Sequence, residues 1–540
     1  MITKFGVTNY KRFQDTSIVP FSDITILVGS NSSGKSSFIK ALILLIDNIT
    51  NRTHSFFLDK KRLFFDFHSS SFDNISIGTF ARALNDKSNN GTLSLLVKIE
   101  DEGRCRLIEI EIKRYDHDET LGYLSRFKIH DDIPNGYDRA NIYYDFDLLK
   151  GRAYISVPYR QLIDSYMSTG VSLRDMPTYD QELMEEIAND PDLDGYEISS
   201  KKHMWGLSVK PQEPTVDIDN DQNGSIVFHD LEETFTIEKG LARIPVPFGM
   251  TNRNNLIDSL IYGIFDEREK LNLMLDDTDK RRRIFPGTYI IKRMIRDNGR
   301  MLNSFPHIEY IQAHSITKRV FFSIDDRNDY IARTLHEAYQ TRALQHNETN
   351  SFVRGWLRSF KIGDRIEITR VEGDGYTIKI IDIDGRGAKN LVDIGTGSAQ
   401  IVLLLLKVAI ILSTRQTEAV LLVIEEPEQN MHPNFQSLLA DLFLAIQQEG
   451  IRLLVETHSE YMIRRSQVLV AKMSSYMKYT QEKLDSKNPF RVIYFPESGQ
   501  PYDMHYKVNG DFEHLFGEGF FDAAAKNRVE LYKMQLEQNK

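Results

Sequence analysis

Two segments in the N-terminal part of the chain alternate apolar and polar residues. Residues 107–113 read Leu-Ile-Glu-Ile-Glu-Ile-Lys, and residues 92–100 show a similar pattern. A period of two is typical of a strand with one buried and one solvated face. The Asp-Glu-Gly sequence at 101–103 favours a turn between the two segments. The pattern therefore predicts a β-rich N-terminal lobe.

The C-terminal half of the chain has a different pattern, in which short apolar runs alternate with helical segments. We expect strands at 308–311, 376–380, 419–424 and 451–455, and helices at 400–412 and 434–447. Fully apolar strands are typical of a parallel sheet whose two faces are both covered. A further apolar run at 24–28 lies near the N-terminus. We therefore predict one α/β domain that is built from both ends of the chain.

The middle of the chain lacks a sustained period. Acidic stretches such as 185–192 alternate with short helical runs such as 256–273, and no heptad repeat indicates a long coiled coil. We expect a large insertion here, mainly helical or irregular. The predicted domains are an N-terminal lobe at 1–115, the insertion at 116–306, a C-terminal lobe at 307–500 and a tail at 501–540.

Composition restricts the class of protein. Of 540 residues, 41% are hydrophobic and 27% are charged, as in a soluble globular chain. The single cysteine, Cys105, excludes a disulfide framework and a cysteine-based zinc site. The net charge of −10 argues against a protein that mainly coats nucleic acid, while the basic cluster 280–283 could contact phosphate or form a solvated surface. Since no apolar run is long enough for a signal peptide or a membrane span, we expect a cytoplasmic protein without membrane contact.

The sequence Gly-Ser-Asn-Ser-Ser-Gly-Lys-Ser at 29–36 matches the phosphate-binding pattern G-x-x-x-x-G-K-[ST]. An apolar strand leads into this segment and a helical pattern follows it, which is the context that the phosphate-binding loop requires. The alternative interpretation, an ordinary Gly/Ser-rich turn, does not require these flanking elements. Backbone N–H groups of such a loop point at a polyphosphate, Lys35 would reach the β- and γ-phosphates, and Ser36 would bind Mg²⁺. We therefore predict that ATP with Mg²⁺ is bound by Gly29, Asn31, Ser33, Gly34, Lys35, Ser36 and Ser37.

A later apolar strand ends in two adjacent carboxylates, Glu425 and Glu426. Ligands of open α/β sheets bind at the carboxyl ends of the strands, so we expect both acids beside the phosphate loop. Glu425 would hold Mg²⁺ through water, and Glu426 would orient or deprotonate the attacking water. His458 follows the next strand and could contact the γ-phosphate or this water. A charged strand end at the surface and a structural histidine are the alternatives.

A glycine-rich turn precedes the apolar helix. The segment 393–400 has Gly397 and Ser398 at its centre. Glycines and a serine at the start of a helix can bind an anion through exposed N–H groups. A plain helix cap is the alternative interpretation. The two residues are therefore candidates for a further contact to the nucleotide.

Together these motifs resemble the ABC-type ATPase heads of the SMC/Rad50/OLD group, and more closely the compact bacterial ATPases of anti-phage defence that lack long coiled coils. The matching segments, in family order, are 9–13 (the strand that flanks adenine), 29–36 (Walker A), 393–400 (signature), 424–428 with 431–433 (Walker B and D-loop), 456–459 (switch histidine) and 519–522 (tail). The resemblance implies an ABC-type P-loop head that hydrolyses ATP. It also implies a head-to-head homodimer or a higher homo-oligomer, because in this group the signature of one head reaches the γ-phosphate held by the other.

The resemblance leads to two functional expectations. OLD nucleases carry a TOPRIM nuclease after the ATPase, but only 80 residues follow Glu460 here, and Asp382 and Asp384 indicate a hairpin rather than a nuclease site. The chain thus resembles the PtuA ATPase of Septu-type systems, some of them retron-linked, which partners a separate HNH nuclease; the PARIS ATPase is a close competitor. We expect a slow, regulatory ATPase that acts as sensor or scaffold for an effector nuclease. The alternative is a self-sufficient DNA-processing enzyme of the OLD type.

Overall fold

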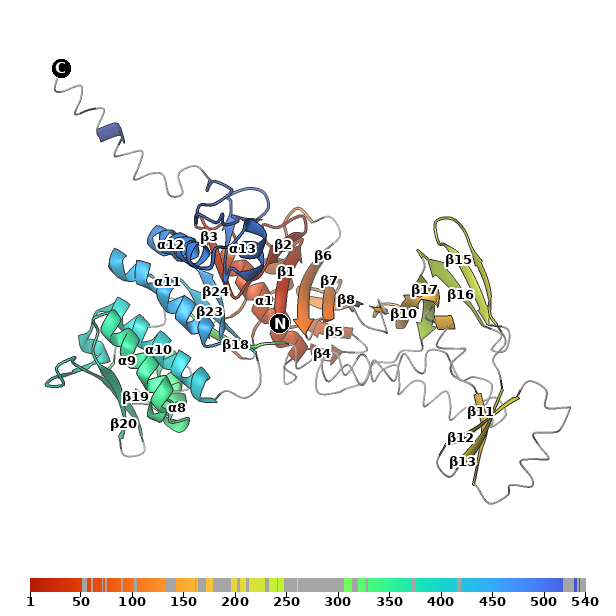
Figure 1. Ribbon diagram of the computed structural model, residues 1–540, viewed down its shortest axis with the longest axis horizontal. Helices are drawn as coiled ribbons and strands as arrows, with labels where there is room; N and C mark the ends of the chain where they lie inside the picture. The colour runs from red at the N-terminus through yellow and green to blue at the C-terminus, as the bar shows by residue number, and fades with distance from the viewer. Residues whose placement is uncertain are drawn as a thin grey trace.

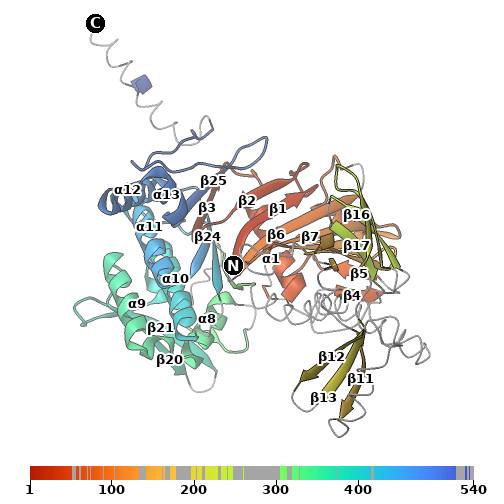
Figure 2. The ribbon, with the colours of Figure 1, turned by 45° about the vertical axis from the view of Figure 1, so that its right-hand side comes forward.

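The computed structural model describes residues 1–246 and 305–517 apart from short gaps, of which the longest is 178–195, together with residues 260, 529–531 and 534. Two large sheets form the centre of the described chain, and a lobe with helices and a small sheet lies to one side (Figure 1). The strands of the predicted insertion lie on the opposite side. Figure 2 shows the same order of parts after a turn of 45°.

The larger sheet contains thirteen antiparallel strands. They are β1 (Ile2–Thr8), β2 (Ser17–Pro20), β4 (Phe56–Asp59), β5 (Arg62–Phe65), β6 (Thr92–Asp101), β7 (Arg104–Tyr115), β8 (Asp118–Asp132), β9 (Ile142–Asp147), β10 (Arg152–Pro158), β14 (Thr215–Ile218), β15 (Gly224–Phe228), β16 (Glu233–Glu238) and β17 (Leu241–Val246). The spatial order is β14-β15-β16-β17-β10-β9-β8-β7-β6-β1-β2, with β4 and β5 beside β8. The β-rich N-terminal lobe is confirmed, since the two alternating segments form β6 and β7.

The second sheet is the predicted parallel one. Its strands, in spatial order, are β18 (His307–Ile311), β23 (Val420–Glu425), β24 (Arg452–Glu456), β3 (Ile24–Gly29), β25 (Phe490–Phe495) and β26 (Tyr502–Asp503). All neighbours from β18 to β25 are parallel, and only β26 is antiparallel. Strand β3 comes from the N-terminal region and the others from the C-terminal part. Both ends of the chain therefore build one sheet, as the apolar runs predicted.

Both faces of the parallel sheet are buried. Helix α1 (Lys35–Thr50) lies on one side and the helices α11 (Pro433–Gln448) and α12 (Glu460–Met477) on the other, with α13 (Gln481–Lys487) following. Along β3, Leu27 packs into the core that contains α1 and the larger sheet, whereas Ile26 and Val28 pack into the core that contains α11 and α12. Every residue of β3 is buried. This double burial explains why the strand is apolar apart from Thr25, whose hydroxyl accepts a hydrogen bond of 2.9 Å from the N–H of Ser22.

The helical lobe precedes β23 in the sequence. It contains α8 (Tyr330–Gln340), α9 (Asn347–Ser359), α10 (Thr396–Thr414) and a small sheet of β19 (Phe322–Ser323), β20 (Arg365–Val371), β21 (Gly375–Ile381) and β22 (Ala388–Asn390). Asp382 and Asp384 lie in the hairpin between β21 and β22, as predicted, and Asp382 pairs with Lys389. Of the helices in the described part of the chain, α10 alone is long and apolar enough to span a membrane by composition, and most of it is buried inside the protein.

The insertion differs from the expectation of a mainly helical or irregular segment, which is wrong for its described part. That part consists of strands: β9, β10 and β14 to β17 extend the larger sheet, and β11 (Val171–Pro177), β12 (Tyr196–Lys201) and β13 (Met204–Val209) form a separate sheet. The boundary predicted at residue 115 falls in the turn between the paired strands β7 and β8. The helical run 256–273, apart from helical Leu260, and the segments 280–283 and 519–522 lie outside the described residues.

Candidate functional site

The phosphate loop connects β3 to α1. Gly34 has a φ of +93°, which residues with a side chain rarely adopt, and a Cβ there would lie 2.8 Å from the Phe13 ring. A Cβ at Gly29 would lie 2.3 Å from the carbonyl oxygen of Phe495. Because α1 begins at Lys35, the unpaired N–H groups of its first turn face the loop. The loop is therefore a backbone cradle that needs glycine at both ends.

The side chains of this loop differ in exposure. Asn31 and Ser36 are exposed, Ser37 is half-buried, and Ser33 and Lys35 are buried. The Nζ of Lys35 donates hydrogen bonds of 3.0 Å to the carbonyl oxygens of Gly29 and Ser30. Burial lowers the pKa of Lys35, and the carboxylate of Glu456 opposes that shift. The ammonium group is thus held by backbone oxygens that phosphate oxygens can replace.

Two carboxylates end neighbouring strands beside this loop. Glu425 ends β23 and Glu456 ends β24, and the two residues are register partners. The Oγ of Ser36 donates a hydrogen bond of 2.9 Å to Glu456 Oε1, and Lys35 Nζ lies 3.8 Å from the same oxygen. Burial, and then the charge of Glu425, raise the pKa of Glu456 to about 7. Tyr310 of β18 borders Glu425, and its pKa is raised by burial and by that carboxylate.

This donor set fits a divalent cation. Hydroxyl and carboxylate oxygens are the ligands that Mg²⁺ prefers. Oε2 of Glu456 is buried and has no hydrogen-bond partner among the described residues. Glu456 thus connects the two predicted metal ligands, because it accepts the hydrogen bond from Ser36 and is the register partner of Glu425, and it has spare acceptor capacity.

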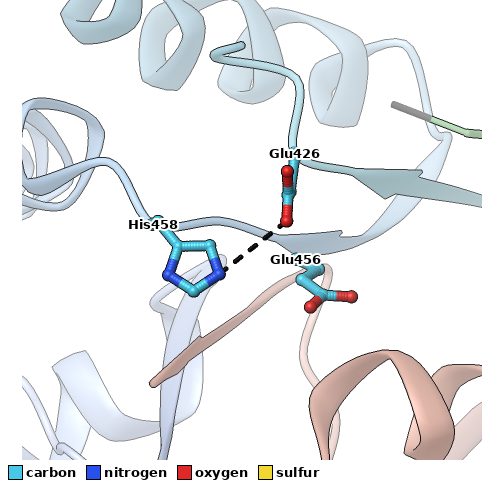
Figure 3. Close-up of side chains that lie close together, drawn as sticks. All are labelled: Glu426, Glu456 and His458. Atoms are coloured by element: carbon cyan, nitrogen blue, oxygen red, sulfur yellow. Dashed lines mark ion pairs between the residues drawn. The ribbon is translucent and has the colours of Figure 1, made fainter. Parts of the chain in front are cut away.

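Glu426 and His458 face each other, and both are half-buried (Figure 3). Glu426 Oε1 lies 3.8 Å from His458 Nε2, and its Oε2 accepts a hydrogen bond from Gln429. The φ of Glu426 is +43°, and its N–H donates to the carbonyl oxygen of Glu456 at 2.8 Å. Burial, and then Lys35, lower the pKa of His458. One ligand atom each of Glu426, Glu456 and His458 lies within 4.8 Å of the other two, so the three could share a cation or a water molecule.

A family model described as AAA ATPase domain matches residues 1–149 and 252–463, which is more than half of the chain. The chain belongs to this family of AAA ATPase domains. It is an ATPase, and the predicted mixed α/β fold is confirmed. No curated protein matches the chain.

Solved structures of SMC heads are similar to this ATPase over nearly all of its length. The SMC head domain from Thermotoga maritima has 11% identity and a TM-score of 0.32, and the match covers 93% of this chain and 99% of that chain. An Smc head bound to the C-winged helix domain of ScpA has 11% identity and a TM-score of 0.34, with 93% and 97% covered. An Smc head with an extended coiled coil, bound to the C-terminal domain of ScpA and derived from Pyrococcus furiosus, has 12% identity and a TM-score of 0.32, with 99% of both chains covered.

The segment 393–400, which was predicted as the signature, packs against the residues that follow β23 in the same chain. Gly397 and Ser398 lie in the first turn of α10, which begins at Thr396. A Cβ at Gly397 would lie 2.6 Å from the carbonyl oxygen of Asn430 and 2.9 Å from Met431 Cγ. Asn430 has a φ of +59°. The structure thus brings Gly397 to the segment after Glu426, and not to the phosphate loop of the same chain.

Two residues of the site were missed in the sequence. Glu456 was noticed only as part of the segment that contains His458, although it ends an apolar strand as Glu425 does. Gln312 directly follows β18, the strand beside β23, and lines a small cavity together with Glu425 and Gln400. The signal in both cases is a polar residue at the carboxyl end of a predicted strand. Only the order of the strands in the sheet shows that these two polar residues lie at the site.

Proposed function

We propose that this ATPase is the sensor or scaffold subunit of a bacterial anti-phage defence system, and that it controls a separate effector nuclease of the HNH type in the cytoplasm. The observation that carries the proposal is the continuous sheet that runs from β1, next to α1 and the phosphate loop, to β14 in the insertion. This sheet joins the nucleotide site to a distant set of strands. These strands provide a surface that bound ATP does not cover, and an effector can bind there.

Within the ATP site we infer a division of labour among the side chains. Lys35 binds the β- and γ-phosphates, and Ser36 with Glu425 would hold Mg²⁺, which neutralises phosphate charge when it is bound. Glu426 accepts a proton from the attacking water, and Gln429 orients its carboxylate. His458 stays neutral near neutral pH because burial lowers its pKa. A neutral imidazole can donate a hydrogen bond to the γ-phosphate and remain beside Lys35 without charge repulsion.

We infer that two heads form a symmetric homodimer in the presence of ATP. Gly397 packs against Asn430 of its own chain. By the resemblance to ABC-type heads, Ser398 next to it would meet the γ-phosphate of a second copy in a two-fold dimer. Ser398→Arg should block this closure by size and charge and leave nucleotide binding intact. Light scattering with a non-hydrolysable ATP analogue measures the state of association. Full hydrolysis by a strictly monomeric protein would contradict the dimer.

The defence role is tested in bacteria and with the purified chain. Co-expression with the nuclease encoded in the neighbouring reading frame should give a stable complex and lower the plaque count after phage infection. Lys35→Ala should abolish this protection, whereas Lys472→Ala, which removes an exposed lysine of α12, should retain it. Unchanged protection in Lys35→Ala would overturn the proposal. Metal-dependent DNA cleavage by the isolated chain, persisting through repurification, would favour a self-sufficient enzyme of the OLD type instead.

A further inference from the structure

Glu456 engages both side chains that the phosphate loop offers to nucleotide and metal. Its Oε1 accepts the hydrogen bond from Ser36 and lies 3.8 Å from the ammonium group of Lys35. The residue is only 3% exposed, because β24 lies between β3 and β23. Glu456 therefore occupies Lys35 and Ser36, the two side chains that a bound polyphosphate and its metal require.

The charges around Glu456 are mostly negative. Glu425 is its register partner at the end of β23, Glu426 follows Glu425 directly, and Lys35 is the cation beside it. Oε2 is buried without a hydrogen-bond partner among the described residues, so half of the carboxylate has unused acceptor capacity. Figure 3 shows this carboxylate directed toward the loop that leads into α1, and not toward His458. A polyphosphate that enters the loop must meet this group.

We propose that Glu456 makes nucleotide binding by this ATPase depend on a divalent cation, because it competes with phosphate for Lys35 and Ser36 until a cation neutralises it. Phosphate oxygens and a carboxylate repel each other when both contact one ammonium group. A divalent cation attracts both groups, since carboxylate and phosphate oxygens are hard ligands. The proposal rests on the ATPase assignment and is independent of the defence role.

The test compares nucleotide affinity with and without metal. Dissociation constants for a non-hydrolysable ATP analogue are measured by calorimetry in Mg²⁺ and in EDTA, for the wild type and for Glu456→Gln, at about pH 8.5, where Glu456 with its pKa of about 7 is ionised. Glutamine keeps the size of the side chain and an acceptor oxygen for Ser36 but removes the charge. If the Glu456 charge lies about 6 Å from a phosphate charge and the effective dielectric constant is about 20, removing the Glu456 charge strengthens binding by up to roughly a hundredfold. We expect Glu456→Gln to bind about tenfold or more tightly in EDTA and no more tightly in Mg²⁺.

The decisive quantity is the ratio of the two dissociation constants, which reports the coupling between metal and nucleotide. In the wild type, binding in EDTA should be at least about tenfold weaker than in Mg²⁺, a measurement that needs no variant. Glu460→Gln removes a glutamate that pairs with Arg464 on α12 and should keep the wild-type ratio. Glu456→Asp keeps the charge and should also keep a large ratio.

Equal affinities of the wild type in Mg²⁺ and EDTA would overturn the proposal. So would an unchanged ratio in a Glu456→Gln protein that melts at the wild-type temperature. Either result would leave the defence role untouched, because the plaque assay tests that role separately.

Discussion

Lys407 connects the parallel sheet to the helical lobe through a buried cluster of charges. It lies on α10 and is 7% exposed. Its Nζ is 2.9 Å from Glu309 Oε2 on β18 and 2.9 Å from Glu337 Oε2 on α8. Burial alone would lower the pKa of Lys407, but the two carboxylates raise it above its ordinary value. The side chain thus stays charged and joins three elements.

Lys407→Met should destabilise the fold by about 3 kcal/mol. Methionine keeps most of the apolar stem but leaves the Glu309 carboxylate, which is 12% exposed, without its ammonium partner. Breaking a buried pair in this way costs about 3–5 kcal/mol. The contact with His307 remains and reduces the loss. Glu337 is 41% exposed, so its ion pair with Lys407 is comparable to a surface ion pair. Losing it adds at most about 1 kcal/mol to the destabilisation.

The double variant Lys407→Met, Glu309→Gln provides the internal control. It removes the orphaned buried charge, so it should be about 2 kcal/mol more stable than Lys407→Met alone. Urea unfolding of the nucleotide-free protein, followed by circular dichroism at neutral pH, measures both differences. Lys472→Met makes the same change at an exposed position of α12 and should have little effect. A Lys407→Met protein as stable as the wild type, or a double variant less stable than the single one, would refute this reasoning.

Four further predictions concern the ATP site. Lys35→Ala should weaken ATP binding by about 10- to 100-fold, the value of a charge-assisted hydrogen bond, in a fluorescent nucleotide titration. Glu426→Gln should retain binding and lower the hydrolysis rate by about 10²- to 10⁴-fold in a phosphate-release assay; a normal rate would exclude Glu426 as the base. Gly397→Ala should lower hydrolysis because its Cβ would meet the Asn430 carbonyl oxygen at 2.6 Å, whereas Gly355→Ala on α9, where nothing lies within 4 Å, should leave the rate unchanged. The pKa of Glu456 is raised from 4.5 to about 7, so the folded protein holds a proton that the unfolded chain releases, and this carboxyl makes the protein less stable as pH rises through that window. Relative to wild type, Glu456→Gln should therefore gain about 2 kcal/mol of unfolding free energy between about pH 5.5 and about pH 8, and a constant difference would contradict the assignment.

The parallel sheet could be predicted because its burial is complete. Strands β3, β23 and β24 are covered on both faces, which favours apolar side chains at nearly every central position and gives short apolar runs. The loop at 29–36 could be predicted because a phosphate cradle restricts the backbone at Gly29 and Gly34. In both cases the physical requirement acts on residues that are adjacent in the sequence.

The strands of the insertion were missed because burial constrains them less. In β14, three of the four residues are exposed and the fourth is half-buried, so no apolar face marks the strand. Strand β10 does alternate, with Ala153, Ile155 and Val157 buried, and its pattern could have been recognised. Weak periodicity in this region therefore reflects exposed sheet faces and not the absence of strands.

Glu456 and Gln312 could not be assigned to the site from the sequence, because their position depends on which strands are neighbours in the sheet. Each follows from the spatial order β18-β23-β24-β3, in which strands far apart in the sequence become neighbours. Apolar runs predict that strands exist but not which of them pair. Once the order is known, Glu456 must lie between the phosphate loop and Glu425, and Gln312 must lie next to Glu425 on the other side.

The strand order also concentrates more acid at the site than one lysine can neutralise. Glu426, Glu428 and Glu456 act on Lys35, Glu425 lies beside Glu456, and burial keeps His458 from supplying a second positive charge. Burial disfavours the charged forms of Glu428 and Glu456 and raises the pKa of both, and neighbouring carboxylates add to the shift, whereas a nearby positive charge opposes it. A divalent cation supplies the same positive charge without changing the oxygen ligands. The acids at the ends of β23 and β24 therefore favour ATP as its metal complex over free ATP.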